Sequence, residues 1–372
     1  MGADPVATAV VRGAGVVSPA GSTLDDLWLG VSAPTGTEAE VITYESAGGL
    51  EALGCRARGF EPETRFGRHE LRRLDRSHHM ALWAAEDALE AAGAGPEPER
   101  CAVVVGLGIG AMAFFEAQHR ALAKRGVRAV SPLTIPVVMP NSAAAHLSMR
   151  TGYRGPALTF TAACASGATA IGEALWLLRT GRADRVLAGG VEAIHTAAVA
   201  ASFSRMEAMS SRFDSPRTAS RPFTATRDGF VLGEGAGFVV LERTGERDGP
   251  DIGAILGYGS SSDAENIVAP AADGRGAAAA MRMALEDAGV APNEIGHVNA
   301  HGTSTPLNDA TEGAAIRAVF GSHRVPVTST KSVIGHLIGA AGAVEAIVCL
   351  LANRRGIVPP IANFDDPDPG ID

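Results

Sequence analysis

The sequence predicts an α/β fold built from stacked layers of sheet and helix. Aromatic residues make up only 5% of the 372 residues, whereas glycine and proline occupy 45 and 21 positions. A core of this composition consists of small aliphatic side chains, which lets helices and strands approach closely. Apolar strand-like runs also alternate with amphipathic helical patterns, an order typical of helix-covered, mainly parallel sheets. Layered α/β architecture is therefore favoured over a helical bundle or an aromatic-rich sandwich.

An internal repeat is the second observation behind this prediction. Residues 88–96 read ALEAAGAGP, and residues 284–292 read ALEDAGVAP. Each segment ends an alanine-rich helical pattern, with Gly93 or Gly289 where a helix-terminating glycine is expected. An apolar strand-like run follows each one, CAVVVGLG in the first copy and IGHVNAHG in the second. Each copy therefore predicts a helix followed by a strand.

A second pair of similar segments lies further along. Residues 167–178, GATAIGEALWLL, resemble residues 339–350, GAAGAVEAIVCL, with Glu173 and Glu345 in matching places. Both segments predict amphipathic helices that open with small residues. The first copy is longer between its two helices, and we place the extra residues in 111–146. Two pairs in the same order indicate duplication rather than chance similarity between alanine-rich helices.

The duplication divides the chain into residues 1–250 and 251–372. Two further runs, RVLAGGVEA and GFVVLER, predict more strands in the first half. If the halves are related by a pseudo-twofold axis, equivalent helix N-termini face one another.

Charge and cysteine content exclude several classes of protein. The chain has 32 basic and 41 acidic residues and a formal charge of −9, which argues against a general nucleic-acid-binding protein. Its cysteines form no C-x-x-C pair, so neither a disulfide framework nor a zinc ribbon is expected. We find no signal peptide, myristoylation motif or bilayer-spanning apolar run. These features predict a cytoplasmic protein without a membrane partner.

The offset between the second pair of segments relates Cys164 to His336. Each residue lies just before a predicted helix, so a thiol and an imidazole should meet at two facing helix N-termini. The positive end of a helix dipole stabilises a thiolate and lowers the pKa of the thiol. The small residues around Cys164, AACASG, leave room for an acyl group. We therefore predict that Cys164 is a nucleophile and that Cys55, Cys101 and Cys349 are inert.

Two further ionisable residues lie in segments suited to catalysis. His301 follows a predicted strand in NAHGTSTP, where α/β proteins place reactive loops. Lys331 lies in an apolar, glycine-rich stretch, where an unpaired ammonium is unfavourable. Glu345 is its candidate partner, since we expect Glu345 to project from the same helix as His336.

Other motifs carry weaker signals. The glycines of GLGIG at 106–110 and GEGAG at 233–237 lack the spacing of a dinucleotide-binding loop, so we expect them to allow close packing. Lys331 precedes its glycines, which argues against a phosphate-binding P-loop. Cys164, His301 and His336 could ligate zinc, but no two are near in sequence. Covalent catalysis without a metal is therefore preferred.

Together these motifs resemble those of the β-ketoacyl-acyl-carrier-protein synthases, and most closely the elongating type II enzymes. TAACASG, HGTSTP and KSVIGHLIGAAG occur in the family's order. The similarity extends from VVRGAGVVSPAG near the start to PPIANFDDPDPG near the end. It implies the thiolase fold, a duplicated five-layer αβαβα structure with mixed, mainly parallel sheets. This expectation agrees with the internal repeat.

The resemblance also implies a mechanism. Cys164 would take an acyl chain as a thioester from the phosphopantetheine arm of acyl carrier protein. His301 and His336 would donate hydrogen bonds to the malonyl thioester, stabilising the enolate that attacks the acyl-cysteine. Lys331 would support the charge and orientation of the histidines. The other implied site residues are the supporting acids Glu345 and Glu312, the arm-contacting Thr303 and Thr305, and the acyl-pocket residues Ile109 and Phe203.

The implied partner is an acidic acyl carrier protein, which brings the phosphopantetheine, so the enzyme needs no cofactor of its own. In the arginine-rich stretch RHELRRLDR, Arg72 and Arg73 match docking positions of the family. A solvated helix face explains the same pattern and stays open. The resemblance also implies a homodimer, or a heterodimer with a chain-length-factor-like subunit.

Two departures from the family pattern stand out. Thr224 occupies a position where relatives usually carry aspartate. The sequence also stops at Asp372, before a glycine-rich strand segment whose Phe-Gly pair completes the family's oxyanion hole and gates its pocket. We expect that segment to be missing from the 251–372 half.

Two alternative functions stay open at this stage. A non-catalytic subunit that shapes product length would resemble a synthase but lack the nucleophile, so Cys164 argues against it. A thiolase acting on coenzyme A esters would carry a second reactive cysteine in a C-x-G motif. Cys349 lies mid-helix without that motif.

Overall fold

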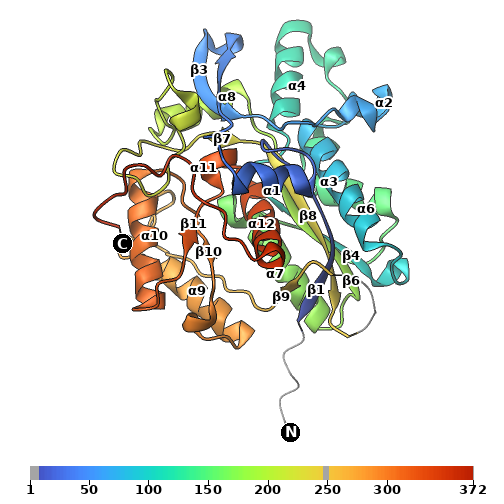
Figure 1. Ribbon diagram of the computed structural model, residues 1–372. Helices are drawn as coiled ribbons and strands as arrows, with labels where there is room; N and C mark the ends of the chain where they lie inside the picture. The colour runs from blue at the N-terminus through green and yellow to red at the C-terminus, as the bar shows by residue number, and fades with distance from the viewer. Residues whose placement is uncertain (1–7, 246–250, 372) are drawn as a thin grey trace.

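The computed structural model describes residues 8–245 and 251–371, and its elements form five layers (Figure 1). The first half is built around a six-stranded sheet with the order β5-β4-β6-β8-β1-β9. Its strands are β1 (Ala9–Val17), β4 (Cys101–Leu107), β5 (Ala157–Phe160), β6 (Arg185–Glu192), β8 (Gly235–Arg243) and β9 (Ala254–Ile255).

The pairing within this sheet is mixed. Strands β5, β4 and β6 are parallel, whereas β8 is antiparallel to both β6 and β1. The predicted mixture of directions is therefore confirmed, but the antiparallel part is larger than the family resemblance implied. The reason is that β8 enters between β6 and β1 from the opposite end of the sheet, which reverses its direction relative to both neighbours.

Two helical layers cover the sheet. One face packs against α3 (Arg76–Ala92) and α6 (Ser142–Thr151), and the other against α7 (Ser166–Arg179) and α12 (Ala341–Arg355). Strand residues alternate between two hydrophobic clusters: Val103 and Val105 join the α3–α6 cluster, while Val104 joins the α7–α12 cluster. This alternation is the period of two that a sheet buried on both faces requires.

The second half supplies the remaining two layers. Strands β10 (Val298–Asn299) and β11 (Val327–Thr328) pair in parallel, and α9 (Arg275–Ala288) and α10 (Pro306–Phe320) lie beyond them. Residues of β10, β11 and α10 share one hydrophobic cluster. The five-layer αβαβα arrangement is present, although the second sheet is much shorter than the first within the described residues.

Shorter elements complete the described chain. A three-stranded sheet has the order β2-β3-β7 and lies next to α8. These and the remaining elements are α1 (Leu24–Ser32), β2 (Glu40–Tyr44), β3 (Leu50–Cys55), α2 (Arg68–Leu71), α4 (Met112–Arg125), α5 (Thr134–Val138), α8 (Ala197–Arg205), β7 (Leu232–Gly233) and α11 (Lys331–Ile334).

The internal repeat corresponds to repeated structure. Helices α3 and α9 both end at the predicted glycines, Gly93 and Gly289, and each leads to a strand, β4 or β10. Helices α7 and α12 are the second pair, and they pack against each other. The first copy has α4, α5 and α6 between β4 and β5, where the second copy has α10 alone. The extra residues therefore lie within 111–146, as predicted.

Glycines allow the layers to approach closely at the centre of the molecule. A Cβ atom at Gly106 would lie 2.2 Å from the carbonyl oxygen of Ser166, and one at Gly190 would lie 2.6 Å from that of Gly339. No side chain fits at those distances. The predicted role of the glycine clusters in close packing is therefore confirmed at Gly106, where strand and helix nearly touch.

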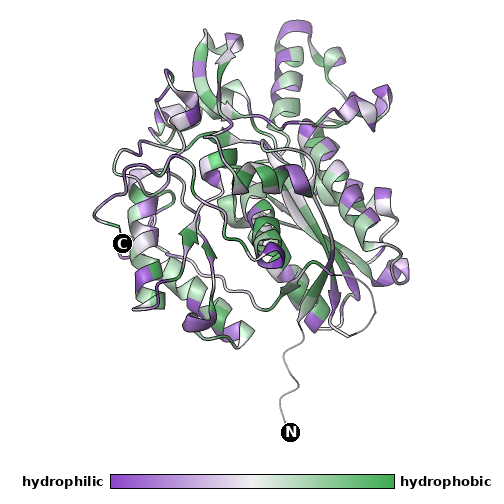
Figure 2. Cartoon of the chain, in the orientation of Figure 1, coloured by the Kyte–Doolittle hydropathy of each residue, from purple (hydrophilic) through white to green (hydrophobic). Residues whose placement is uncertain are grey.

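Hydropathy follows the layers. Figure 2 shows α12, in the middle of the molecule, as predominantly hydrophobic, whereas the outer helices α3, α4 and α10 carry polar residues as well. A helix buried between a sheet and its neighbours has this character. Among the described residues, no helix combines the length and apolar content needed to cross a membrane.

Candidate functional site

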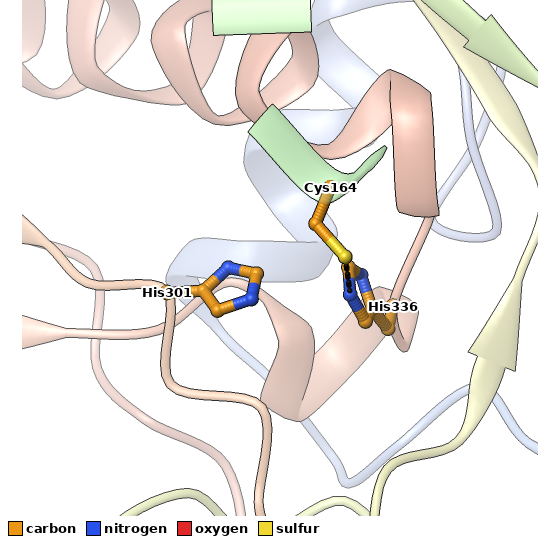
Figure 3. A group of neighbouring side chains, drawn as sticks. All are labelled: Cys164, His301 and His336. Atoms are coloured by element: carbon orange, nitrogen blue, oxygen red, sulfur yellow. Dashed lines mark hydrogen bonds between the residues drawn. The ribbon is translucent and has the colours of Figure 1, made fainter. Parts of the chain in front are cut away.

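Cys164 and His336 lie opposite each other at the predicted pseudo-equivalent positions. Cys164 belongs to a short 3-10 turn, Ala163–Ala165, directly before α7, and His336 lies just before the turn that leads into α12. The Sγ of Cys164 is 3.0 Å from the Nε2 of His336 (Figure 3). The expectation that the duplication brings a thiol and an imidazole together is confirmed.

The residue before each of these two has a positive φ. Ala163 has φ of +47° and Gly335 has φ of +70°. Glycine adopts a positive φ without strain, whereas Ala163 keeps one only where its surroundings enforce it. The two sharp turns place the side chains of the following residues, Cys164 and His336, in the same space.

Hydrogen bonds determine which nitrogen of His336 carries the proton. The backbone N–H of Ile338 donates to Nδ1 at 3.2 Å, so Nδ1 is unprotonated. The neutral ring therefore carries its hydrogen on Nε2, which faces the Cys164 sulfur. The main chain of His336 is also held, because its N–H donates to Val231 and its carbonyl oxygen accepts from Gly233. His336 is thus a fixed hydrogen-bond donor.

His301 completes the cluster from the second half. Its ring centroid is 5.1 Å from that of His336, with the two planes nearly perpendicular, and Figure 3 shows both rings beside the thiol. The Glu312 carboxylate holds this loop, accepting the backbone N–H of His301 at 2.6 Å and of Gly302 at 2.7 Å. Burial raises the pKa of Glu312, and these two hydrogen bonds oppose the shift. Glu312 therefore orients the His301 backbone.

Electrostatics favour neutral histidines at this site. Burial, reinforced by the positive charge of Lys331, holds the pKa of His301 and of His336 well below the ordinary value. For the thiol the structure differs from our expectation, because burial raises the pKa of Cys164 more strongly than Lys331 lowers it. The prediction of a lowered thiol pKa at the helix N-terminus was wrong, since desolvation outweighs the attraction of nearby positive charge.

Lys331 is buried beside the cluster and is paired. Its side chain is only 1% exposed, and its Nζ lies 2.5 Å from Oε1 of Glu345. The predicted partner is therefore confirmed, but not the predicted geometry. Glu345 comes from α12, whereas His336 precedes that helix in a loop, so the two do not share a helix. The ion pair places one balanced cation next to both histidines.

A cavity of about 1160 Å³ opens at this cluster. Thr303 and Thr305 line it together with Cys164 and Phe203. The two threonine hydroxyls are 2.9 Å apart, and Thr305 caps α10. Ile109 is not among the residues that line this cavity, and its assignment to the acyl pocket stays a prediction. The loop after β4 leaves the Ile109 side chain 42% exposed.

Sequence reasoning missed one residue behind the threonine loop. Arg227 donates from its guanidinium to the carbonyl oxygens of Thr305 and Pro306, and it pairs with Asp368. Its neighbours in the sequence, TATRDGF, are largely polar, so no local pattern distinguished it. The nearby Thr224 accepts a hydrogen bond from Nε of Arg221, which also pairs with Asp365. The aspartate-to-threonine departure therefore leaves that arginine with partners.

A second missed residue is Glu192, at the end of β6. Its side chain is fully buried, and its carboxylate accepts backbone N–H groups from the loop after β4 and from Gly339. The glutamate that closes the apolar run RVLAGGVEA was its only sequence signal.

A metal centre at this cluster is disfavoured by the state of His336. The ligand atoms of Cys164, His301 and His336 lie within 4.8 Å of one another, so their spacing alone would suit a metal ion. Nε2 of His336, however, carries hydrogen and has no lone pair to offer. The donor set therefore fits hydrogen bonding to a substrate better than metal ligation.

The proposed docking arginines lie on the surface. Arg72 and Arg73 follow α2 and are exposed. Arg76 of the same stretch is already engaged, since it forms a two-point ion pair with Glu234. Within RHELRRLDR, Arg72 and Arg73 therefore remain accessible to a partner.

Comparison with known proteins agrees with this site. Residues 7–247 match the family model for the β-ketoacyl synthase N-terminal domain, and residues 252–365 match that for its C-terminal domain. The chain is 37% identical to 3-oxoacyl-acyl-carrier-protein synthase 2 of Synechocystis sp., covering 98% of this chain and 89% of the relative. It is 38% identical to the Vibrio cholerae protein of the same name, covering 97% and 90%.

Solved structures show the same similarity. The ishigamide ketosynthase/chain length factor superposes with a TM-score of 0.88 at 32% identity, covering 98% of this chain and 90% of that chain. The complex AntDE:AntF, a type II polyketide synthase acyl carrier protein with its ketosynthase, gives a TM-score of 0.88 at 30% identity, covering 99% and 91%. This chain therefore belongs to the β-ketoacyl synthase family, and its fold is that of the thiolase-type ketosynthases.

Proposed function

We propose that this chain is a ketosynthase that condenses an acyl group held on Cys164 with malonyl-acyl carrier protein. The product is a 3-oxoacyl-acyl carrier protein, formed with loss of carbon dioxide. The observation that carries the proposal is the thiol facing the Nε2 hydrogen of His336, with a second neutral histidine beside it. A nucleophile next to two hydrogen-bond donors fits acyl transfer followed by enolate stabilisation.

In the first step, Sγ of Cys164 attacks the thioester carbonyl of the acyl-phosphopantetheine. A carbon–sulfur bond to Cys164 forms, and the bond to the carrier's sulfur breaks. The cysteine proton passes to the departing carrier thiol, so no external acid is needed. His336 favours this step because its Nε2 hydrogen stabilises negative charge on the cysteine sulfur.

In the second step, malonyl-acyl carrier protein enters the same cavity. The bond from the malonyl methylene to its carboxylate breaks, carbon dioxide leaves, and the thioester oxygen becomes an enolate. N–H groups of His301 and His336 donate to that oxygen. The enolate carbon then attacks the acyl carbonyl, and the Cys164 sulfur leaves as a thiolate, to be protonated before the next cycle.

The buried Lys331–Glu345 pair supports this chemistry without contacting the substrate. The Lys331 cation adds to the lowering of the pKa of both histidines, and it opposes the rise that burial causes in the pKa of Cys164. Neutral histidines keep a hydrogen for donation without becoming cations that bind the carboxylate to be lost. Thr303 and Thr305 suit the carrier arm, and Phe203 suits the acyl chain, since all three line the cavity.

The partner in this proposal is an acyl carrier protein, docked at Arg72 and Arg73, and no other cofactor is required. The complex AntDE:AntF joins a related ketosynthase to its carrier protein.

We further propose a dimer through β5, which lies at an edge of the six-stranded sheet, where unpaired backbone groups can receive another strand. A chain length factor is the partner of the related ketosynthase ApeO. The free cysteines fit the cytoplasmic location predicted above.

Two alternatives are weaker. A non-catalytic chain-length subunit has no use for a thiol held against an imidazole, and Cys164 is so held. A thiolase would need a second reactive cysteine near the first, but Cys349 is part of α12 and burial raises the pKa of its thiol to about 11. The pathway served, fatty acid or polyketide, is left to the loading experiment that follows.

Replacing Cys164 by alanine is expected to abolish both acyl loading and condensation, because no other group can form the thioester. Cys164→Gln should also block loading but retain malonyl decarboxylation, since the histidines stay in place. Intact-protein mass spectrometry after incubation with acyl carrier proteins bearing different chains measures the loading. Cys101→Ala, at a buried cysteine of β4, is the matched control. Full elongation by Cys164→Ala would refute the mechanism.

The two histidines should differ in the step that each affects. His301→Ala is expected to lower malonyl decarboxylation by about 10²–10³-fold, the usual effect of removing one oxyanion donor, and to leave loading of Cys164 largely intact. His336→Ala should impair both steps, because its Nε2 hydrogen faces the sulfur itself. Separate assays of acyl loading and carbon dioxide release test this, with the exposed His119→Ala as control. Equal effects on both steps by His301→Ala would contradict the assignment.

Charge reversal at the docking arginines should weaken carrier recognition only. Arg72→Glu together with Arg73→Glu is expected to raise KM for carrier-bound substrate about tenfold at low salt, with kcat nearly unchanged. Substrates on free pantetheine should react as with wild type. The exposed Arg354→Glu, at the far end of α12, controls for loss of positive charge. Unchanged kinetics at low salt would remove Arg72 and Arg73 from the interface.

A further inference from the structure

The fully buried Glu192 carboxylate joins two backbone segments next to the reactive cluster. It accepts N–H groups from Gly108 at 2.8 Å, Ile109 at 3.1 Å and Gly110 at 2.9 Å, all in the loop after β4. It also accepts the N–H of Gly339 at 3.2 Å. Four N–H donors on one carboxylate form a strong, charge-assisted junction.

The junction leaves no space for side chains. A Cβ atom at Gly108 would lie 2.4 Å from Oε2 of Glu192, and one at Gly339 would lie 2.3 Å from the backbone nitrogen of Gly108. The carbonyl oxygen of Gly339 in turn lies against Gly167 of α7. The segment around Gly339 is therefore held between Glu192 and the helix that follows the nucleophile.

Ile338, one of the two residues between His336 and Gly339, is strained. Ile338 has φ of +46°, which is a genuine outlier for a β-branched side chain and costs of order 1–3 kcal/mol. Its N–H is the group that donates to Nδ1 of His336. Such a conformation persists only where its neighbours hold it, and the next residue, Gly339, is bound by Glu192. The strained backbone of Ile338 therefore connects the Glu192 carboxylate, through Gly339, to His336.

We propose that Glu192 is a positioning residue that keeps Ile338 strained and so keeps the hydrogen of His336 on Nε2. The inference rests on the proposed function, because Nε2–H is the donor used for loading and for decarboxylation. Without the Gly339 bond, Ile338 can relax to negative φ and withdraw its N–H from Nδ1. The neutral ring is then free to carry its hydrogen on Nδ1, and Nε2 no longer donates.

Glu192 accepts from all four donors in its ionised form, and its surroundings act on that form in opposite directions. Burial raises the pKa of Glu192 to about 7, and its N–H bonds to Gly110, Ile109, Gly339 and Gly108 oppose the rise. The carboxylate also raises the pKa of Cys164, although burial and the charges of Lys331 and Glu345 have larger effects there. Glu192 therefore acts on the cluster mainly through the backbone that it holds.

Glu192→Gln tests the proposal, because the amide keeps the size of the side chain but offers one acceptor oxygen and turns an NH₂ towards donors. Malonyl decarboxylation per folded molecule is expected to fall about tenfold, because the variant removes part of the support of an oxyanion donor. Histidine nitrogen NMR should show hydrogen on Nδ1 of His336. A merely structural role would lower activity only with the folded fraction and leave the tautomer unchanged.

Glu242→Gln is the matched control. Glu242 is a buried glutamate near the C-terminal end of β8 and pairs with Arg185, whereas Glu192 ends β6 beside the start of β8. This control should lower stability without changing the tautomer of His336. If Glu192→Gln does not fold, Glu192→Asp tests the proposal instead. Its side chain is shorter by one methylene, so this variant should change the tautomer and the decarboxylation rate in the same direction but by less. A wild-type tautomer and wild-type decarboxylation per folded molecule in either variant would overturn the proposal.

Failure of the proposed function would look different. If wild-type protein neither loads acyl chains on Cys164 nor releases carbon dioxide from malonyl carrier protein, the ketosynthase assignment fails. The tautomer of His336 in Glu192→Gln would still report on the role of Glu192, because that measurement needs no substrate.

Discussion

The site depends on the close approach of two helix N-termini at the centre of the molecule. A Cβ atom at Gly167 of α7 would lie 2.9 Å from the carbonyl oxygen of Gly339, just before α12. Because residue 167 is glycine, the turns before α7 and α12 come near enough for Cys164 to contact His336. The low aromatic content and the many glycines of the sequence serve this approach, since bulkier layers would hold the two halves apart.

Once the halves meet, electrostatics determine the chemistry. Burial holds both histidines neutral and raises the pKa of the thiol. One cation, Lys331, is present, and Glu345 balances it at 2.5 Å. The arrangement provides N–H donors where charge develops on a substrate oxygen, without a free cation that would hold a carboxylate in place. The protein therefore controls the placement of the histidine N–H donors more than it controls the ionisation of the thiol.

Much of this could be predicted from the sequence because the duplication is visible in it. Two pairs of helical segments predicted the layers and the meeting of Cys164 with His336, and the motifs around His301 and Lys331 predicted the rest of the cluster. The thiol pKa was predicted with the wrong sign, because a helix dipole can be inferred from sequence but burial depth cannot. Glu192 was missed because its four partners are backbone N–H groups, which no side-chain pattern reveals.

The central claim is that His336 acts as a neutral donor with its hydrogen on Nε2. Nitrogen NMR of histidine-labelled wild-type protein near neutral pH measures this directly, with His336→Ala used to assign the signal. The account predicts a neutral ring, hydrogen on Nε2 and an unprotonated Nδ1 that accepts the N–H of Ile338. A doubly protonated ring, or a neutral ring with its hydrogen on Nδ1, would contradict it.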